Sequence, residues 1–309
     1  AHNIKDLVKI YEYSLPKILV FHNKLSTEIK LGNNKVSRED YLNKINPLLI
    51  NVKKVFISES KRRDWGMTGD VILPGIDVND YGGYRGENPS VLRVGNLIKE
   101  RDLMMGFTTS ESILSGLPSV TLGLNPNIRG SRISSGFNDL LDHYRSLRVY
   151  LHTTANEYED GYNLSLLEAM AVGMPIISTA NKTSPIINGI NGYISDDIQY
   201  LRTCVARLLD DPVLANSLGQ KARETVREKF SQIKFLQLWI KSIEVAIVEF
   251  LERSTKELPK KDIGLNAQPE NTSMPQYFQN IRDDIVSLVP DDAIDILEIG
   301  CAAGMTGNE

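Results

Sequence analysis

The stretch EDGYNLSLLEAMAVGMPIIST, from Glu159 to Thr179, carries the strongest structural signal of this sequence. Asn163 is a favourable helix N-cap, and the apolar run at 164–172 predicts a helix. Gly173 predicts the end of that helix, because glycine readily adopts the left-handed conformation that often follows a helix. The next apolar run, 175–178, predicts a buried strand. A helix followed at once by a buried strand is typical of an α/β domain.

Besides Glu159 at its start, this stretch contains two acidic side chains that packing alone does not explain. Glu168 falls on the inner face of the helix, and Asp160 lies eight residues earlier, in a loop. Gly161 lets backbone approach closely, and a helix N-terminus offers free N–H groups that suit a phosphate. Glu168 could accept hydrogen bonds from two hydroxyls of a ribose, and Asp160 could hold hydroxyls of a neighbouring sugar. The residues together predict a site for a nucleotide-linked sugar.

Structural roles would also explain both acids. Glu168 would then be a buried acid paired with a nearby Lys or Arg, since ion pairs also place charges inside proteins. Asp160 would be an ordinary turn residue. The spacing of the two acids leaves both interpretations open.

The rest of the chain alternates strands with helices, which predicts parallel sheets covered by helices. Residues 1–76 contain three predicted strands and no opening glycine-rich turn, so we expect an incomplete N-terminal domain there. A turn-rich connection then leads to a second domain, 77–254, and 255–275 is proline-containing and linker-like. The predicted strands are Lys17–Phe21, Lys54–Ser58, Asp70–Leu73, Val91–Gly95, Ser119–Leu124, Arg148–His152 and Pro175–Ser178. The main predicted helices are Arg38–Leu48, Asp102–Ser115, Gly136–Ser146, Ile198–Leu209, Pro212–Lys229 and 231–254.

Composition narrows the function classes. The chain has 309 residues, 41% hydrophobic and 24% charged, which is ordinary for a soluble protein of about two domains. A net charge of -4 argues against a nucleic-acid partner. Residues 1–76 carry 13 Lys and Arg against 8 Asp and Glu, so this part could face an anionic membrane or acceptor, although solvated helix faces are the simpler explanation. Cys204 and Cys301 form no zinc or disulfide pattern, and no apolar run is long enough to span a bilayer. We therefore expect a cytoplasmic protein, at most peripheral at the inner membrane face.

Residues 160–177 resemble the E-x7-E region of family-four retaining glycosyltransferases, which have the GT-B fold of two facing Rossmann-like domains. The matching residues are Asp160-Gly161-Tyr162-Asn163, Leu166 to Ala171, Gly173, and Pro175 to Ile177. The resemblance implies that Glu168 binds the nucleotide ribose and that Asp160 meets the donor sugar. It also implies donor contacts around the start of the helix, from Gly161, Tyr162, Asn163 and Leu164. Asp160 and Asn163 stand where the family usually has Glu and Gly.

The resemblance extends over about residues 15–250 and implies further donor contacts. Arg101 matches a family lysine on the donor diphosphate, Asn96 stands where an arginine is expected, and Lys99 could supply the second cation. His22 matches a histidine that touches the donor at the end of a strand. Main-chain contacts to the donor are expected near Thr179. Without the resemblance, solvated loop charges and a surface histidine would explain the same residues.

The implied reaction transfers a sugar from a nucleoside-diphosphate sugar to a hydroxyl, with retention at the anomeric carbon. No Asp-x-Asp motif follows a predicted strand, so we expect transfer without a metal and without another cofactor. The resemblance implies a saccharide or lipid-linked acceptor and a role in cell-surface polysaccharide or glycan synthesis. The alternatives are a sugar-nucleotide epimerase and a non-catalytic module that binds nucleotide sugars.

The last residues carry a different signal. Asp295–Gly304, within 276–309, resembles motif I of S-adenosylmethionine-dependent methyltransferases, with Glu298, Gly300 and Gly304 at the cofactor-binding positions. In such folds the acid that binds the cofactor ribose follows this motif at a distance that would place it after Glu309. We therefore expect a truncated methyltransferase start, which would use S-adenosylmethionine only in a full-length parent. A generic strand–turn–helix is the alternative.

Overall fold

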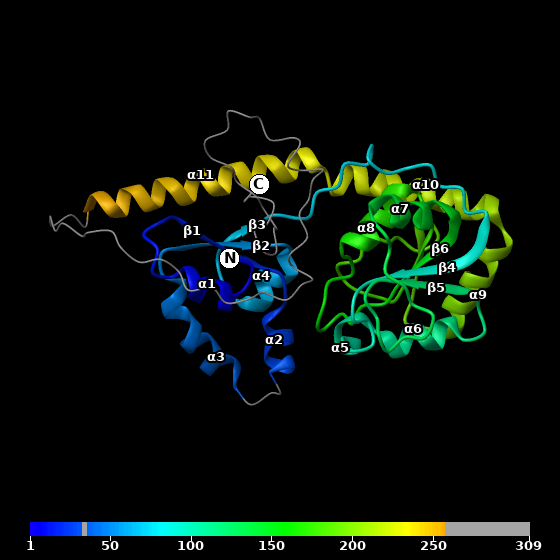
Figure 1. Cartoon of the computed structure of the whole chain (residues 1–309), viewed down its shortest axis with the longest axis horizontal. Helices are drawn as coiled ribbons and strands as arrows, with labels where there is room; N and C mark the ends of the chain where they lie inside the picture. The colour runs from blue at the N-terminus through cyan, green and yellow to red at the C-terminus, as the bar shows by residue number, and fades with distance from the viewer. Residues whose placement is uncertain (33–35, 257–309) are drawn as a thin grey trace. The chain divides into compact units, whose positions relative to one another are not determined.

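Two parallel sheets organise the part of the chain that the structure, a computed structural model, describes: residues 1–32 and 36–256 (Figure 1). The first sheet has the strand order β1-β2-β3 and the second the order β5-β4-β6-β7-β8. Every strand pair within them is parallel, so the α/β prediction is confirmed. The linker from residue 257 onward and the methyltransferase-like segment 276–309 lie outside the described residues.

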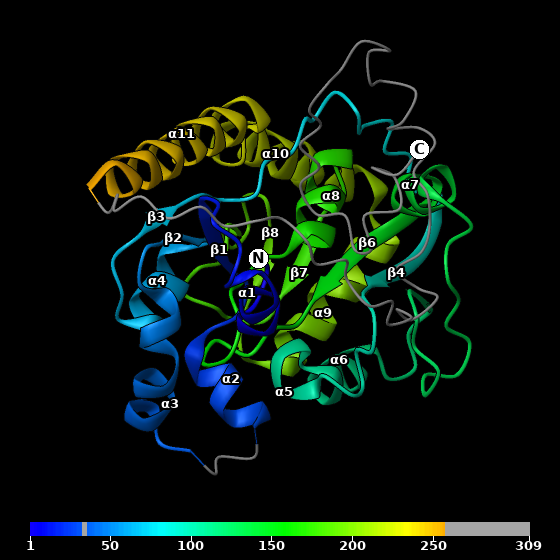
Figure 2. The same cartoon turned by 60° about the vertical axis from the view of Figure 1, so that its left-hand side comes forward.

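The first sheet and its helices come from the first 71 residues. Its strands are β1 (Lys17–Phe21), β2 (Val52–Phe56) and β3 (Asp70–Val71), and its helices are α1 (Ile4–Ile10), α2 (Leu25–Leu31), α3 (Arg38–Ile45), the 3-10 helix Asn46–Leu49, and α4 (Glu59–Trp65). Side chains alternate along a strand, so Leu19 and Phe21 pack with Trp65 on one face, while Val20 packs with Trp239 on the other. Trp239 belongs to α11 (Gln232–Lys256), which lies along this second face (Figures 1 and 2). The last long helix, expected to complete the second domain, therefore covers the first sheet.

The second sheet is covered by helices on both faces. Its strands are β4 (Asn88–Val94), β5 (Ser119–Leu122), β6 (Leu147–His152), β7 (Ile176–Ser178) and β8 (Gly192–Ile194). Its helices are α5 (Asp102–Met105), α6 (Phe107–Leu114), α7 (Phe137–Ser146), α8 (Leu164–Val172), α9 (Ile198–Asp210) and α10 (Pro212–Lys229). Leu92, Tyr150 and Ile176 pack against α7 and α8, whereas Val149 and Ile177 pack against α6 and α9. This double covering explains why the strands read as continuous apolar runs.

Most predicted elements agree with the structure to within a few residues, and one differs. The helix predicted over Asp102–Ser115 is two helices, because Gly106 has a left-handed φ of 58°. A Cβ at this position would lie 2.9 Å from the carbonyl oxygen of Thr153, so only glycine fits. Strand β8 was not among the predicted elements, because Gly192–Ile194 begins with a glycine and lacks an apolar run like the one that predicts β7.

The expected boundary at residue 76 falls in the connection between the sheets. The Ile76 N–H donates to the Phe230 carbonyl oxygen at 2.8 Å, just before α11 begins. The outgoing and returning segments of the chain therefore run side by side at this point.

Candidate active site

Helix α8 is held at both ends by the residues that the sequence singled out. The Asn163 side chain accepts from the Leu166 N–H and from the Ser165 hydroxyl, both at 2.9 Å. Gly173 follows the helix with a φ of 101°. Ser165 also donates to the Val94 carbonyl oxygen at 3.2 Å, so the start of α8 lies at the carboxyl end of β4. This is the edge of a parallel sheet at which ligands bind.

Glu168 is partly buried and is held by two tyrosines. The Tyr144 hydroxyl donates to its Oε2 at 2.9 Å and the Tyr81 hydroxyl to its Oε1 at 3.4 Å. Burial raises the pKa of Glu168, and the two phenol hydrogen bonds act in the opposite direction. Among the described residues no Lys or Arg forms an ion pair with it. The structural interpretation of Glu168 as half of an ion pair therefore does not apply within this part of the chain.

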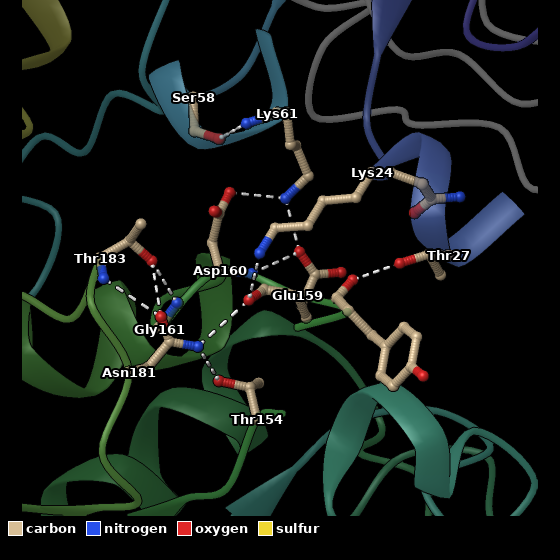
Figure 3. Close-up of polar contacts among 12 residues, drawn as sticks. Lys24, Thr27, Ser58, Lys61, Thr154, Glu159, Asp160, Gly161, Asn181 and Thr183 are labelled. Atoms are coloured by element: carbon tan, nitrogen blue, oxygen red, sulfur yellow. Dashed lines mark hydrogen bonds and ion pairs between the residues drawn. The ribbon is translucent and has the colours of Figure 1, made fainter. Parts of the chain in front are cut away.

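Asp160, by contrast, is the acid that forms the ion pair (Figure 3). Its side chain is 1% exposed, and its Oδ2 accepts from the Lys61 ammonium at 2.6 Å. The same ammonium lies 2.5 Å from Oε1 of Glu159, which also accepts from the Asp160 N–H at 2.9 Å. Oδ1 of Asp160 is buried and has no hydrogen-bond partner among the described residues. A turn residue would be exposed, so a turn role alone does not explain Asp160.

The cations at this site come from helices of the first sheet. Lys61 lies in α4, where the Ser58 hydroxyl caps its N–H. Lys24, the residue before α2, donates from its ammonium to the carbonyl oxygens of Asn156 at 2.8 Å and Glu159 at 3.2 Å. Burial lowers the pKa of Lys24 against the opposing effect of the nearby carboxylates. The loop after β6 is thus fixed by groups that lie more than 90 residues earlier in the chain.

Gly161 lies where two loops meet. Its N–H donates to the Thr183 hydroxyl at 2.7 Å, and a Cβ at this position would lie 2.6 Å from the backbone nitrogen of Ser184. The Asn181 amide donates to the Glu159 carbonyl oxygen at 3.1 Å. Close backbone approach therefore explains the glycine, as the sequence predicts.

The loop after β4 contains the three predicted diphosphate-binding residues. Asn96 accepts from the Leu124 N–H at 2.8 Å and so joins the loops that follow β4 and β5. Lys99 and Arg101 are exposed, and the Lys99 ammonium lies 5.9 Å from the centre of the Phe107 ring. The two cations are therefore open to solvent at the carboxyl edge of the second sheet, while Asn96 has a structural contact.

The other predicted donor contacts are more dispersed. Tyr162 is 8% exposed and packs edge-on against Phe230, with ring centres 5.2 Å apart, and Leu164 is 56% exposed at the start of α8. Thr179 lines a cavity of about 330 Å³ together with residues of α6 and α9, on the opposite face of the second sheet from α8. The structure therefore does not bring the Thr179 side chain to Glu168.

His22 follows β1 directly and lies near Lys61. Partial burial, and then the positive charges of His2 and Lys61, lower the pKa of His22 to about 4. Its Nε2 lies 3.1 Å from Nδ1 of His2. His22 is therefore a neutral imidazole near pH 7.

Sequence reasoning missed the partners that hold the two acids. Tyr81 and Tyr144 have no motif of their own, and only their place in the folded chain brings them to Glu168. Lys61 lies three residues after the capping Ser58, in a helix that follows a strand, which is a weak signal without coordinates.

Within residues 1–32 and 36–256 there is no group of three His, Cys, Asp or Glu side chains that could hold a metal ion. Over the same residues, none of the helices has the length and apolar character needed to cross a membrane.

Comparison with solved structures identifies the class of fold. The chain superposes on a structure of Staphylococcus aureus TarM with a TM-score of 0.56 and 20% identity, covering 73% of this chain and 50% of that one. It superposes on Anabaena HepE in complex with UDP-glucose with a TM-score of 0.60 and 16% identity, covering 79% and 77%. The chain therefore has a GT-B-like fold.

Sequence comparison matches part of the chain to a known family. Residues 119–211 match the family described as Glycosyl transferases group 1. The segment contains β5 to α9, and with them both Glu168 and the loop that carries Asp160.

Two relatives match a part of the chain. It is 33% identical over 95 residues to poly(ribitol-phosphate) alpha-N-acetylglucosaminyltransferase of Staphylococcus aureus (strain COL), which covers 29% of this chain and 19% of that protein. It is 24% identical over 133 residues to the capsular polysaccharide biosynthesis glycosyltransferase CapM of Staphylococcus aureus, which covers 42% and 33%. The matched segment thus spans a third or less of the length of either relative.

Proposed function

We propose that this chain acts as a retaining glycosyltransferase that moves a sugar from a nucleoside-diphosphate sugar to a hydroxyl. One observation carries the proposal: Asp160 is a buried carboxylate with a free oxygen, eight residues before Glu168, on the loop that leads into α8. A buried oxygen without a partner is costly unless a ligand or water supplies a donor. Sugar hydroxyls are such donors.

Each acid has a separate role in this proposal. Glu168 accepts hydrogen bonds from the ribose hydroxyls, and Tyr81 and Tyr144 hold its carboxylate in place. Asp160 accepts from a hydroxyl of the donor sugar. The remaining predicted contacts at Gly161, Tyr162, Asn163, Leu164 and Thr179 would be mainly backbone or packing contacts. The N-terminal end of α8 favours the negative diphosphate between ribose and sugar.

The chemical step separates charge. The bond from the anomeric carbon to the diphosphate oxygen breaks, a bond to the acceptor oxygen forms on the same face, and the acceptor proton leaves to a base. The transition state resembles an oxocarbenium ion. The positive end of α8 stabilises the departing diphosphate, together with Lys99 and Arg101 from the loop after β4. His22 contacts the donor as a neutral group. No metal ion is required in this scheme.

The similar proteins suggest the donor and the acceptor. HepE is described in complex with UDP-glucose and TarM in complex with UDP, which favours a uridine diphosphate sugar as donor here. The curated relatives are named for capsular polysaccharide and poly(ribitol-phosphate). A growing cell-surface polysaccharide, free or lipid-linked, is therefore the acceptor we favour, and the basic segment 1–76 could meet its anionic groups or an anionic membrane. The expected domains, an N-terminal acceptor-side one over 1–76 and a donor-binding one over 77–254, belong to the same proposal.

The segment 276–309 is a separate proposal. Its resemblance to a methyltransferase start concerns residues that the structure does not describe, and the family match ends at residue 211. A coupled glycosyl and methyl transfer in a full-length parent remains a prediction from Glu298, Gly300 and Gly304 alone. Binding of S-adenosylmethionine by that parent would test it.

Calorimetric titration of UDP, ADP and GDP into the chain tests the nucleotide site. We expect one of them, UDP first, to bind, and Glu168→Ala to weaken binding about tenfold or more, because hydrogen bonds to a charged group contribute about 1.5–3 kcal/mol. Glu224→Ala, at an exposed glutamate of α10 that pairs with Lys221, is the matched control and should leave binding unchanged. Failure of the unaltered chain to bind any of the three nucleotides would overturn the proposal.

Product analysis with a labelled UDP-sugar then separates the possible activities. Transfer of the label to an acceptor with retained anomeric configuration supports the glycosyltransferase. Label recovered in an altered sugar nucleotide would instead support an epimerase. Nucleotide binding without any product, over a panel of saccharide and polyol-phosphate acceptors, would favour a non-catalytic binding module.

A further inference from the structure

Three charged side chains lie around Asp160, namely Glu159, Lys61 and Lys24, and of the two cations only Lys61 contacts carboxylates. Lys61 is 2% exposed and bridges Asp160 Oδ2 at 2.6 Å and Glu159 Oε1 at 2.5 Å (Figure 3). Lys24 reaches backbone carbonyl oxygens of the same loop. An ammonium removed from water to this extent needs close carboxylates. The two carboxylates therefore hold the Lys61 ammonium in place, and the ammonium holds both carboxylates.

The bridge selects which oxygen of Asp160 stays available. Lys61 contacts Oδ2, whereas no residue in 1–32 or 36–256 forms a hydrogen bond to the buried Oδ1. Glu159 accepts from the Asp160 N–H, which holds the backbone in the same orientation. Oδ1 is therefore the oxygen of this carboxylate whose hydrogen-bonding capacity the described residues leave unused.

We propose that Lys61 is the positioning residue for the donor sugar, and this inference rests on the proposed function. Lys61 orients Asp160 so that Oδ1 receives a sugar hydroxyl, while the nucleotide is bound elsewhere by Glu168. The nucleotide end of the site, at Glu168, and the sugar end, at Asp160, are then held by different parts of the chain. The partners of Glu168 come from residues that follow the first sheet, whereas Asp160 depends on a helix of the first sheet.

The difference between the two lysines supports a role for Lys61 at the carboxylate rather than in general docking. Both lysines join helices of the first sheet to the loop after β6, and the Thr27 hydroxyl also donates to the Tyr158 carbonyl oxygen. Loss of Lys61 would leave Lys24 and Thr27 to hold the loop backbone. The Asp160 carboxylate would lose its orientation, and this loss would weaken binding of the sugar but not of the nucleotide.

The test compares UDP with UDP-glucose in calorimetric titrations of the 309-residue chain. The measured quantity is the ratio of the Kd for UDP-glucose to the Kd for UDP. We expect Lys61→Met to raise this ratio about tenfold and to leave the Kd for UDP within about twofold of its original value. Arg63→Met is the matched control, because Arg63 lies in the same helix, is exposed and pairs only within the helix with Glu59, and we expect no change in the ratio.

A double-variant cycle shows whether Lys61 acts through Asp160. Asp160→Asn alone should raise the ratio as Lys61→Met does, and the two substitutions together should raise it no further. Should Lys61→Met fail to fold, as judged by circular dichroism, Lys61→Gln keeps a donor without the charge and should raise the ratio by less.

Three outcomes would overturn the inference while leaving the proposed function intact. They are an unchanged ratio in Lys61→Met, an equal loss of affinity for UDP and UDP-glucose, and fully additive effects in the double variant. If the unaltered chain binds no nucleotide, the proposed function itself fails and the inference fails with it.

Discussion

The two acids of the 160–168 segment are held in opposite ways. Glu168 lies on α8 and its carboxylate is held by the neutral hydroxyls of Tyr81 and Tyr144. Asp160 lies on the preceding loop and is held by the positive charge of Lys61. Glu168 is thus held by neutral hydroxyl groups of residues that follow the first sheet. Asp160 is held by the ammonium of a lysine in α4, a helix of the first sheet.

This difference determines how the charge of each carboxylate affects the stability of the fold. A buried carboxylate beside neutral donors still bears a cost of desolvation, which is why burial raises the pKa of Glu168. A buried carboxylate beside an ammonium is compensated, but each partner becomes necessary to the other. Removing charge should therefore have opposite effects on stability at the two acids.

The largest expected effect concerns the cation. Lys61→Met leaves Asp160 and Glu159 adjacent and unpaired, so we expect the free energy of unfolding to fall by about 3 kcal/mol. Arg63→Met removes an exposed charge from the same helix and should change it by less than about 0.5 kcal/mol. Urea denaturation followed by circular dichroism measures both. Equal losses in the two variants would show that Lys61 is not compensating the buried acids.

The next effect concerns the paired acid itself. Asp160→Asn removes a charge-assisted hydrogen bond to Lys61, so we expect a loss of about 2 kcal/mol in the free energy of unfolding. The same urea denaturation at pH 7.5 measures it. The paired comparison is Glu168→Gln, for which we expect a change of opposite sign. A stabilising Asp160→Asn would contradict the distinction between the two acids.

The sequence predicted α8 and its environment well for physical reasons. Asn163, Gly173 and the apolar run between them act locally, so their effects can be recognised without the fold. The carboxyl ends of parallel strands meet at one edge, which places α8 beside β4 once the alternation is recognised. The two acids beside a helix start suggested a site for a nucleotide-linked sugar, the family resemblance implied the same roles for Asp160 and Glu168, and these roles stay predictions.

The partners of the acids could not be predicted in the same way. Lys61 and Asp160 are 99 residues apart, and a lysine in a helix rich in charged residues carries no sign of its buried ammonium. The sequence left an ion pair at Glu168 open as the structural alternative, and the structure has an ion pair at Asp160. Long-range contacts of this kind depend on how the whole chain folds, which local patterns do not encode.

A smaller effect of opposite sign is expected at Glu168. Burial raises the pKa of Glu168 above its ordinary value of 4.5, so the folded protein holds this proton more firmly than the unfolded chain. That contribution stabilises the fold at low pH and is lost as the pH rises from 4.5 through the folded value. Glu168→Gln should therefore raise the free energy of unfolding at pH 7.5 by about 1 kcal/mol, and by less at pH 4.5. Urea denaturation at the two pH values measures this, and a destabilising effect at pH 7.5 would contradict it.

An effect of similar size at the start of α8 separates the nucleotide end of the site from the sugar end. Asn163→Ala removes the cap of α8, so we expect a loss of about 1 kcal/mol in stability. The cap also orders the helix start that is proposed to face the diphosphate, so UDP should bind more weakly. Lys61 and Asp160 are untouched, so UDP-glucose should weaken by the same factor, and the ratio of the two Kd values should stay constant. A changed ratio would mean that the helix start also positions the sugar, and that the two ends of the site are not held independently.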